Sequence, residues 1–393
     1  MGVSVEQQLK HNLSQVAYAS LLIAVLVVLL TACASRPQEG QQIRTILPQE
    51  AIDASTTATT IAPQVNEDTR HTILALSAGG PDGAFGAGVL AGWTARGTRP
   101  EFNVVTGVST GALLAVFAFL GSEYDQLLQT IYTTQTNESI FRQRGLAGVL
   151  GDSLYDNEPL KRQIQQYVTP EILSKIAEEH RKGRRLYIAT TNLDAGELVV
   201  WDMGKIAIGE GGGRADSLQH FQKVLRASAA VPGFFQPVYI KPKRGVQLRQ
   251  AHVDGGVKEP VLYASYMGRS SAPKRELFMV INGSTKRFNA SVPVEPNLQS
   301  IAQKTIFELM RELQSDTIFR HFVRAEKDGV DFYMTSIPDS VPIAQKSLDF
   351  DPVRMRRLFQ AGYQIGLEGT DNWLRRPPSI SRELKQAALD APQ

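Results

Sequence analysis

Short apolar runs alternate along the chain with longer segments in which apolar residues recur at helical spacing. The runs have about the four to eight residues of a buried strand and are rich in aliphatic or β-branched side chains. They lie at residues 72–77, 103–106, 185–191 and 276–281. Helical spacing is found at residues 122–133, 158–168, 171–182 and 218–230. Strands that alternate with helices predict an α/β, three-layer domain with a mainly parallel central sheet flanked by helices.

A hairpin and a C-terminal group of elements complete this pattern. The run at 197–203 is the expected partner of the strand at 185–191, because Asp194 and Gly196 between them are typical turn residues. Further strands are expected at residues 238–240, 247–253 and 331–336, the last at an edge of the sheet. Apolar residues at helical spacing predict helices at residues 298–323 and 351–373.

The N-terminal region has the pattern of a secretory signal. Residues 17–30 are nearly all apolar, Lys10 precedes them, and small residues follow. The segment Leu30-Thr-Ala-Cys33 resembles the bacterial lipobox, in which the cysteine is acylated and becomes the mature N-terminus. We therefore expect a lipoprotein signal peptide over residues 1–32, with Cys33 as the lipidated residue. A signal-anchor helix is the alternative, because the apolar run nears the length that spans a bilayer.

A region rich in Gln, Thr, Ala and Pro follows this signal. We expect residues 33–69 to be a flexible tether, with room for a short helix near 47–52. Residues 70–375 then form the folded domain, and 376–393 form a C-terminal tail. Ala34 follows the cysteine in place of the aspartate that keeps Gram-negative lipoproteins at the inner membrane. The resemblance to lipoproteins therefore implies a palmitate-type anchor in the bacterial envelope, at the outer membrane and facing the periplasm.

Composition excludes several classes of function. Hydrophobic residues make up 42% and charged residues 21% of the 393 positions, which is typical of a globular protein. The net charge of +3 is small and the basic residues are scattered, so nucleic acid is not an expected partner. Cys33 is the only cysteine, which excludes a disulfide within the chain and a zinc site built from cysteines.

A serine stands at the predicted turn between a strand and a helix. The sequence Gly107-Val-Ser109-Thr-Gly111 follows a β-branched run and precedes an apolar run at 112–120. A Gly-x-Ser-x-Gly turn of this kind holds the serine at strained backbone angles, and side chains at the flanking positions would clash. The Ser109 hydroxyl would then project from the sheet edge at the N-terminus of a helix, where the dipole favours negative charge. A simple helix N-cap is the alternative role for Ser109.

A glycine-rich loop follows the first predicted strand, at residues 78–88. Its spacing fits neither a Walker loop nor a dinucleotide fingerprint, which disfavours nucleotide binding. The N–H groups of Gly79 and Gly80 are candidates for an oxyanion hole, in which one donor contributes about 3 kcal/mol to lowering the barrier. Pro81 has no N–H to donate. Asp82 is a candidate N-cap of the next helix.

A third stretch, Asp254-Gly255-Gly256, comes directly after a predicted strand. Glycines at these positions let the aspartate lie close to another backbone. His252 lies two residues earlier and would share a strand face with Asp254, where it could tune the site.

These motifs, in this order, resemble the patatin-like phospholipase family. That family has a glycine-rich oxyanion loop, a Gly-x-Ser-x-Gly elbow and a later Asp-Gly-Gly or Asp-Gly-Ala. The block at 227–237 also resembles the family, and within it we expect Ser228 to pack without reacting. The family motif covers Gly83 as well as the glycines named above. Two residues depart from it: Ala78 stands where a glycine is usual, and Asp82 where a basic residue is usual. We expect the Asp82 carboxylate to point away from the site, since it would oppose an oxyanion.

The resemblance implies a serine hydrolase that cleaves fatty acyl esters of lipids, as a phospholipase A or lysophospholipase does. It assigns Ser109 as the nucleophile and Asp254 as the base that takes its proton, with an acyl-enzyme intermediate and no metal or organic cofactor. A carboxylate in a partly dry cleft has a raised pKa and is a better base near neutral pH. Two alternatives stay open: a Ser-His-Asp esterase that uses His321, and a lipid-binding envelope protein without activity.

Overall fold

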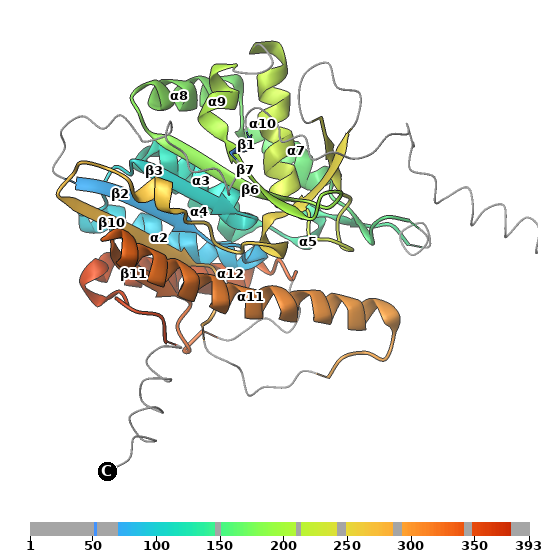
Figure 1. Ribbon diagram of the computed structural model, residues 1–393. Helices are drawn as coiled ribbons and strands as arrows, with labels where there is room; N and C mark the ends of the chain where they lie inside the picture. Colours follow the sequence, from blue (N-terminus) through green and yellow to red (C-terminus); the bar gives the residue numbers. More distant parts are fainter. Residues whose placement is uncertain are drawn as a thin grey trace, which may run out of the picture.

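The computed structural model describes residues 51–52, 70–145, 151–209, 214–241, 249–285, 293–341 and 348–378 (Figure 1). The predicted signal peptide, Cys33, most of the tether and the end of the tail lie outside these residues. In the described part of the chain, no helix combines the length and the apolar character that crossing a bilayer requires.

A parallel sheet forms the centre of the domain, as the alternating pattern predicts. Its five parallel strands are neighbours in the order β6, β3, β2, β10, β11. They are β2 (Arg70–Leu76), β3 (Val104–Val108), β6 (Arg185–Asn192), β10 (Lys274–Ile281) and β11 (Asp331–Ser336). The last of these lies at the sheet edge, as expected. The carboxyl ends of β2, β3 and β10 therefore meet along one edge of the sheet.

Antiparallel strands extend the sheet beyond β6. The hairpin of β6 and β7 (Glu197–Asp202) confirms the predicted pairing. β9 (Gln250–Asp254) pairs with the end of β6 and with β8 (Val238–Ile240). Residues Ala51–Ile52 form β1, which pairs with β7, so these two residues are neither helical nor part of a free tether.

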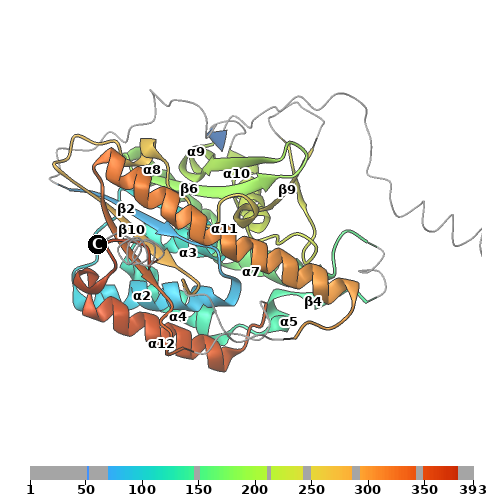
Figure 2. The same cartoon turned by 60° about the horizontal axis from the view of Figure 1, so that its bottom comes forward.

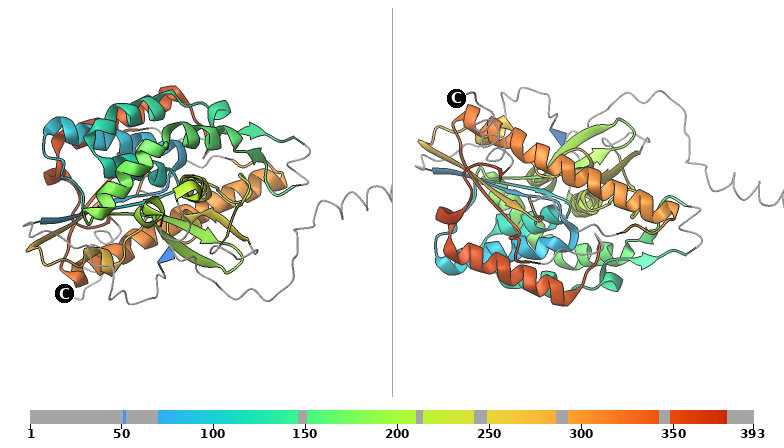
Figure 3. Two further views of the ribbon diagram at one scale, coloured as in Figure 1. Left: turned by 90° about the horizontal axis from the view of Figure 1, so that it is seen from above. Right: turned by 90° about the horizontal axis from the view of Figure 1, so that it is seen from below.

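Helices cover both faces of the sheet (Figures 2 and 3). One face packs against α2 (Gly83–Arg96), α3 (Thr110–Leu120), α4 (Asp125–Thr134) and α12 (Pro352–Glu368). The hairpin side of this face carries α7 (Glu158–Tyr167), α8 (Pro170–Arg181), α9 (Met203–Ile208) and α10 (Arg214–Ser228). The opposite face packs against α11 (Leu298–Asp328). Along β2, Leu74 and Leu76 enter the first core, whereas Ile73 and Ala75 enter the second. This alternation produces the predicted three layers.

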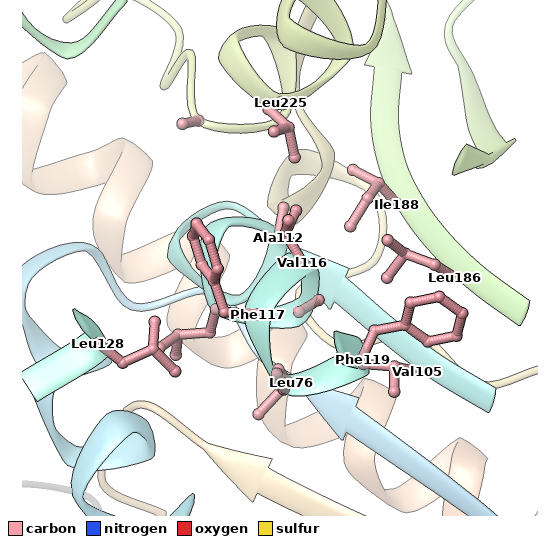
Figure 4. Close-up of a cluster of buried hydrophobic side chains, with 14 of the residues drawn as sticks. Leu76, Val105, Ala112, Val116, Phe117, Phe119, Leu128, Leu186, Ile188 and Leu225 are labelled. Atoms are coloured by element: carbon pink, nitrogen blue, oxygen red, sulfur yellow. The ribbon is translucent and has the colours of Figure 1, made fainter. Parts of the chain in front are cut away.

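The helix α3 lies at the centre of the larger core (Figure 4). Its residues Ala112 and Val116 face Leu186 and Ile188 of β6, with Leu225 of α10 close by. This packing fixes the start of α3 against the sheet, directly beside the end of β3.

The helices α2 and α12 approach each other very closely. A Cβ atom on Gly88 would lie 2.0 Å from the Phe359 carbonyl oxygen, and one on Gly362 would lie 2.1 Å from the Phe85 carbonyl oxygen. Only glycine permits this separation. The helix α12 is shorter than the predicted span of 351–373, because Gly369 takes a positive φ of 84° and ends it.

Candidate active site

Ser109 occupies the turn between β3 and α3 with a φ of 57° and a ψ of −124°. Among the described residues it is the only one other than glycine with a positive φ. Such a conformation persists only when the surrounding structure enforces it. A Cβ atom on Gly107 would lie 2.3 Å from the Gly111 carbonyl oxygen, and one on Gly111 would lie 2.3 Å from the Leu76 carbonyl oxygen. Both flanking glycines are therefore required, as the spacing predicts.

The backbone of Ser109 is held by a second serine. The Ser109 N–H donates to the Ser228 hydroxyl at 3.0 Å, and that hydroxyl donates to the Ala189 carbonyl at 2.7 Å. Ser228 is fully buried in α10. It packs, as expected, but it also joins α10, β6 and the strained turn through hydrogen bonds that the sequence pattern did not reveal.

Asp254 ends β9 and is completely buried. Its Oδ1 accepts a hydrogen bond from the Gly256 N–H at 2.7 Å. A Cβ atom on Gly255 would lie 2.5 Å from the Ala189 carbonyl oxygen, so this glycine lets β9 approach β6 closely. Burial raises the pKa of Asp254 to about 7, and the hydrogen bonds from the Ser109 hydroxyl and the Gly256 N–H offset part of that rise. The two predicted reactive groups thus lie together, and burial shifts the pKa of the carboxyl toward neutrality.

Gly79 and Gly80 of the glycine loop line the same cavity as Ser109. A Cβ atom on Gly79 would lie 2.1 Å from the Asn282 carbonyl oxygen, and Gly80 has a φ of 56°. Neither amide donates to another described residue. The amide of Ala78, by contrast, donates to the Pro260 carbonyl at 2.8 Å. A Cβ atom on Gly83 would lie 2.3 Å from the Thr110 hydroxyl, so this glycine lets α2 begin against the elbow.

Asn282 supports the loop and is absent from the sequence-based site. Its side chain accepts from the Gly86 N–H at 3.0 Å and donates to the Ser77 carbonyl at 2.8 Å. Asn282 comes directly after β10, at the same sheet edge as Ser109. The sequence could have indicated Asn282, because it is a polar residue at the carboxyl end of a buried strand.

Asp82 stands at the N-cap position of α2, as expected, but its side chain makes no capping hydrogen bond. The residue lines the same cavity as Ser109. Its Oδ1 lies 2.7 Å from Nη1 of Arg354 in α12. Burial raises the pKa of Asp82, and the Arg354 guanidinium offsets part of this rise.

The two candidate histidines lie elsewhere. His321 is buried in α11, where its Nε2 lies 3.0 Å from Glu259 and 2.9 Å from the Val261 carbonyl. His252 contacts Thr190 at 3.0 Å and packs against Trp201, and burial lowers its pKa to about 4. Neither lines the cavity that holds Ser109, so the expected tuning by His252 has no contact to support it.

Ser109, Asp254, Gly79 and Gly80 all line one cavity of about 560 Å³. Much of its wall is aliphatic or aromatic, and the helices α3, α4, α7 and α10 contribute part of this apolar lining. This part includes Leu113, Val116, Leu128, Ile164 and Leu225. Residues of α11 and α12 line the more polar part, including Lys304, Glu308, Arg311 and Arg354. A cavity that combines apolar walls with a polar region suits a ligand that joins an ester to a hydrocarbon chain.

Within the described ranges, no three histidine, cysteine or carboxylate side chains lie close enough together to hold a metal ion.

Comparison with known proteins finds a family model that matches part of this chain. Residues 74–265 match the model of a family described as patatin-like phospholipase. Among solved structures, VipD from Legionella pneumophila is similar at a TM-score of 0.43 and 11% identity, over 87% of this chain and 72% of that one. The complex of full-length SpcU with full-length ExoU from Pseudomonas aeruginosa gives a TM-score of 0.33 and 12% identity, over 90% and 69% of the two chains. No curated protein matches the sequence.

Replacing Ser228 with alanine should loosen the elbow. The Ser109 N–H would lose its acceptor in a buried site, which costs about 1–3 kcal/mol of unfolding free energy. Urea unfolding measures this loss, and labelling by a fluorophosphonate probe should slow in parallel. Thr130→Ala is the matched control, because its hydroxyl bonds only its own exposed helix. Equal stability and labelling of the two variants would contradict this role for Ser228.

Proposed function

Because residues 74–265 form a patatin-like phospholipase domain, we propose that the chain hydrolyses fatty acyl esters of phospholipids or lysophospholipids through a Ser109–Asp254 dyad. The family supports a lipid acyl hydrolase as the general activity. The observation that carries the dyad is the burial of Asp254 beside Ser109, in a cavity that contains two free loop amides.

The proposed reaction begins when the Ser109 oxygen attacks the ester carbonyl. Asp254 accepts the serine proton, for which its pKa of about 7 is well matched near neutral pH. The N–H groups of Gly79 and Gly80 donate to the oxyanion as charge develops on it. Collapse of the tetrahedral intermediate expels the alcohol, which takes the proton from Asp254, and leaves an acyl-enzyme on Ser109.

Water then attacks the acyl-enzyme. Asp254 takes a proton from this water, the same amides hold the second oxyanion, and the fatty acid leaves as Ser109 regains its proton. The aliphatic wall of the cavity holds the acyl chain in this scheme. Burial of each methylene contributes about 0.8 kcal/mol, which favours long-chain esters over short ones.

Asp82 motivates a second candidate, a lipid-binding protein without turnover. A carboxylate that lines the cavity is unfavourable for an oxyanion. The ion pair with Arg354 weakens this objection, because it supplies a compensating charge. The Ser-His-Asp alternative receives no support from His321, which contacts Glu259 and lies outside the cavity wall.

Probe labelling of the purified protein separates these functions. A fluorophosphonate should label the parent, and Ser109→Ala should abolish labelling. Asp254→Asn should slow it by about 10²–10⁴-fold, because general-base catalysis has this magnitude. His321→Ala is expected to keep the parent rate. Release of fatty acid from phospholipid vesicles should follow the same order.

Loss of labelling in His321→Ala with full labelling of Asp254→Asn would support the triad. A folded parent that binds vesicles but neither labels nor releases fatty acid would support the binding protein.

We also propose that the chain is a lipoprotein of the bacterial envelope, anchored through acylated Cys33 to the outer membrane and facing the periplasm. The support is the sequence of residues 1–33 alone. An anchor of this kind would hold the domain at a bilayer, where its proposed substrate lies.

Metabolic labelling with an alkyne analogue of palmitate tests the anchor. The parent expressed in a Gram-negative host should incorporate the label, lose residues 1–32 and fractionate with the outer membrane. Cys33→Ser should lose the label and remain unprocessed. A parent that keeps its first 32 residues, as judged by intact mass, would contradict the proposal.

A further inference from the structure

Asp82 places a carboxylate at an unfavourable position for the proposed reaction. It comes two residues after Gly80 in the loop that presents the oxyanion amides, and it lines the same cavity as Ser109. An ionised carboxylate beside a developing oxyanion raises the energy of the transition state, because like charges repel strongly where water is scarce. A cation next to Asp82 would offset this repulsion.

Arg354 supplies that cation from a distant part of the sequence. Its Nη1 lies 2.7 Å from Asp82 Oδ1, and its side chain is only 14% exposed. Its own amide donates to Asp351 Oδ2 at 3.2 Å, which fixes the first turn of α12. The guanidinium also lines the cavity. Ion pairs that are shielded from water in this way are screened little by salt.

The packing of α12 makes the position of this cation precise. The glycines of α2 and α12 bring the two backbones together, as the close approaches at Gly88 and Gly362 demonstrate. Because α2 starts at Gly83, directly after the loop, α12 is fixed relative to the loop itself (Figure 1). The helix α12 spans Pro352–Glu368, well beyond the family match, which ends at residue 265.

We propose that Arg354 is a positioning residue of the active site, which acts by neutralising Asp82 so that the amides of Gly79 and Gly80 can stabilise an oxyanion. This inference rests on the proposed function. It makes α12 a working part of the catalytic unit, although α12 lies outside the matched domain. The proposal also says that Arg354 acts through its charge, and not by attaching the glycine loop to α12 mechanically.

Steady-state hydrolysis of a neutral p-nitrophenyl acyl ester tests the proposal, at about pH 8.5 so that Asp254 is ionised. Arg354→Met should lower kcat about tenfold or more, with KM changed less than about threefold. Adding Asp82→Asn to Arg354→Met should restore most of the lost kcat, because the uncompensated charge is gone. Asp82→Asn alone should lower kcat less than Arg354→Met does, and Arg354→Lys should retain most activity.

The matched control is Arg96→Met. Arg96 lies at the other end of the same helix pair, where it donates to the Leu367 carbonyl at 3.0 Å and lies 4.0 Å from Asp371. It should leave kcat within about twofold of the parent. Thermal melting of every variant separates a loss of fold from a loss of rate. If Arg354→Met does not fold, the kcat values of Asp82→Asn and Arg354→Lys still test the proposal.

Two results would overturn this role of Arg354. One is a folded Arg354→Met with the kcat of an active parent. The other is evidence that the ion pair only attaches the loop mechanically. Either a double variant with a kcat as low as that of Arg354→Met, or an Asp82→Asn variant whose own kcat is tenfold lower than that of the parent, would be such evidence. A parent without turnover overturns the proposed function and this inference with it, whereas an active parent with an indifferent Arg354 overturns the inference alone.

Discussion

The strained turn at Ser109 is the constraint on which the rest of the site depends. A serine at a φ of 57° is unfavourable, and it persists because β3, α3 and the loop after β2 leave no room for another path. Gly107 and Gly111 permit this approach, and Ser228 accepts the hydrogen bond of the strained amide. The close approach that strains the serine also places Ser109 at the edge of the sheet where β2, β9 and β10 end, beside the other groups of the site.

Burial determines the chemistry at that edge. Asp254 has lost contact with water, and this loss raises its pKa to about 7. The same shift makes the stability of the fold depend on pH. Because the pKa of Asp254 is raised, the folded state holds the carboxyl proton more tightly than the unfolded chain does. This contribution to stability is present at acidic pH and is lost as the pH rises toward and through about 7. In the proposed mechanism, desolvation thus makes Asp254 the base without a histidine, and the same apolar cavity holds the acyl chain.

Local motifs made much of this site predictable. Ser109, Gly79 and Gly80 come after parallel strands, whose carboxyl ends meet at one edge of the sheet, so sequence patterns were enough to anticipate that they lie together. Asp254 ends the antiparallel strand β9, and its place in the site was expected from the resemblance to the family. Asn282, the hydrogen bond of Ser228 and the pairing of Arg354 with Asp82 were not predicted, because each joins residues more than a hundred positions apart through side chains that carry no motif.

The pH dependence of Ser109 acylation is the most direct test of the central claim, that a buried carboxylate activates this serine. The second-order rate of fluorophosphonate labelling should rise about tenfold per pH unit below an apparent pKa near 7 and level off above it, because Asp254 must be ionised to accept the proton. Asp254→Asn should be slow and nearly flat over the same range. A parent rate without this step, or the same step in Asp254→Asn, would contradict the account.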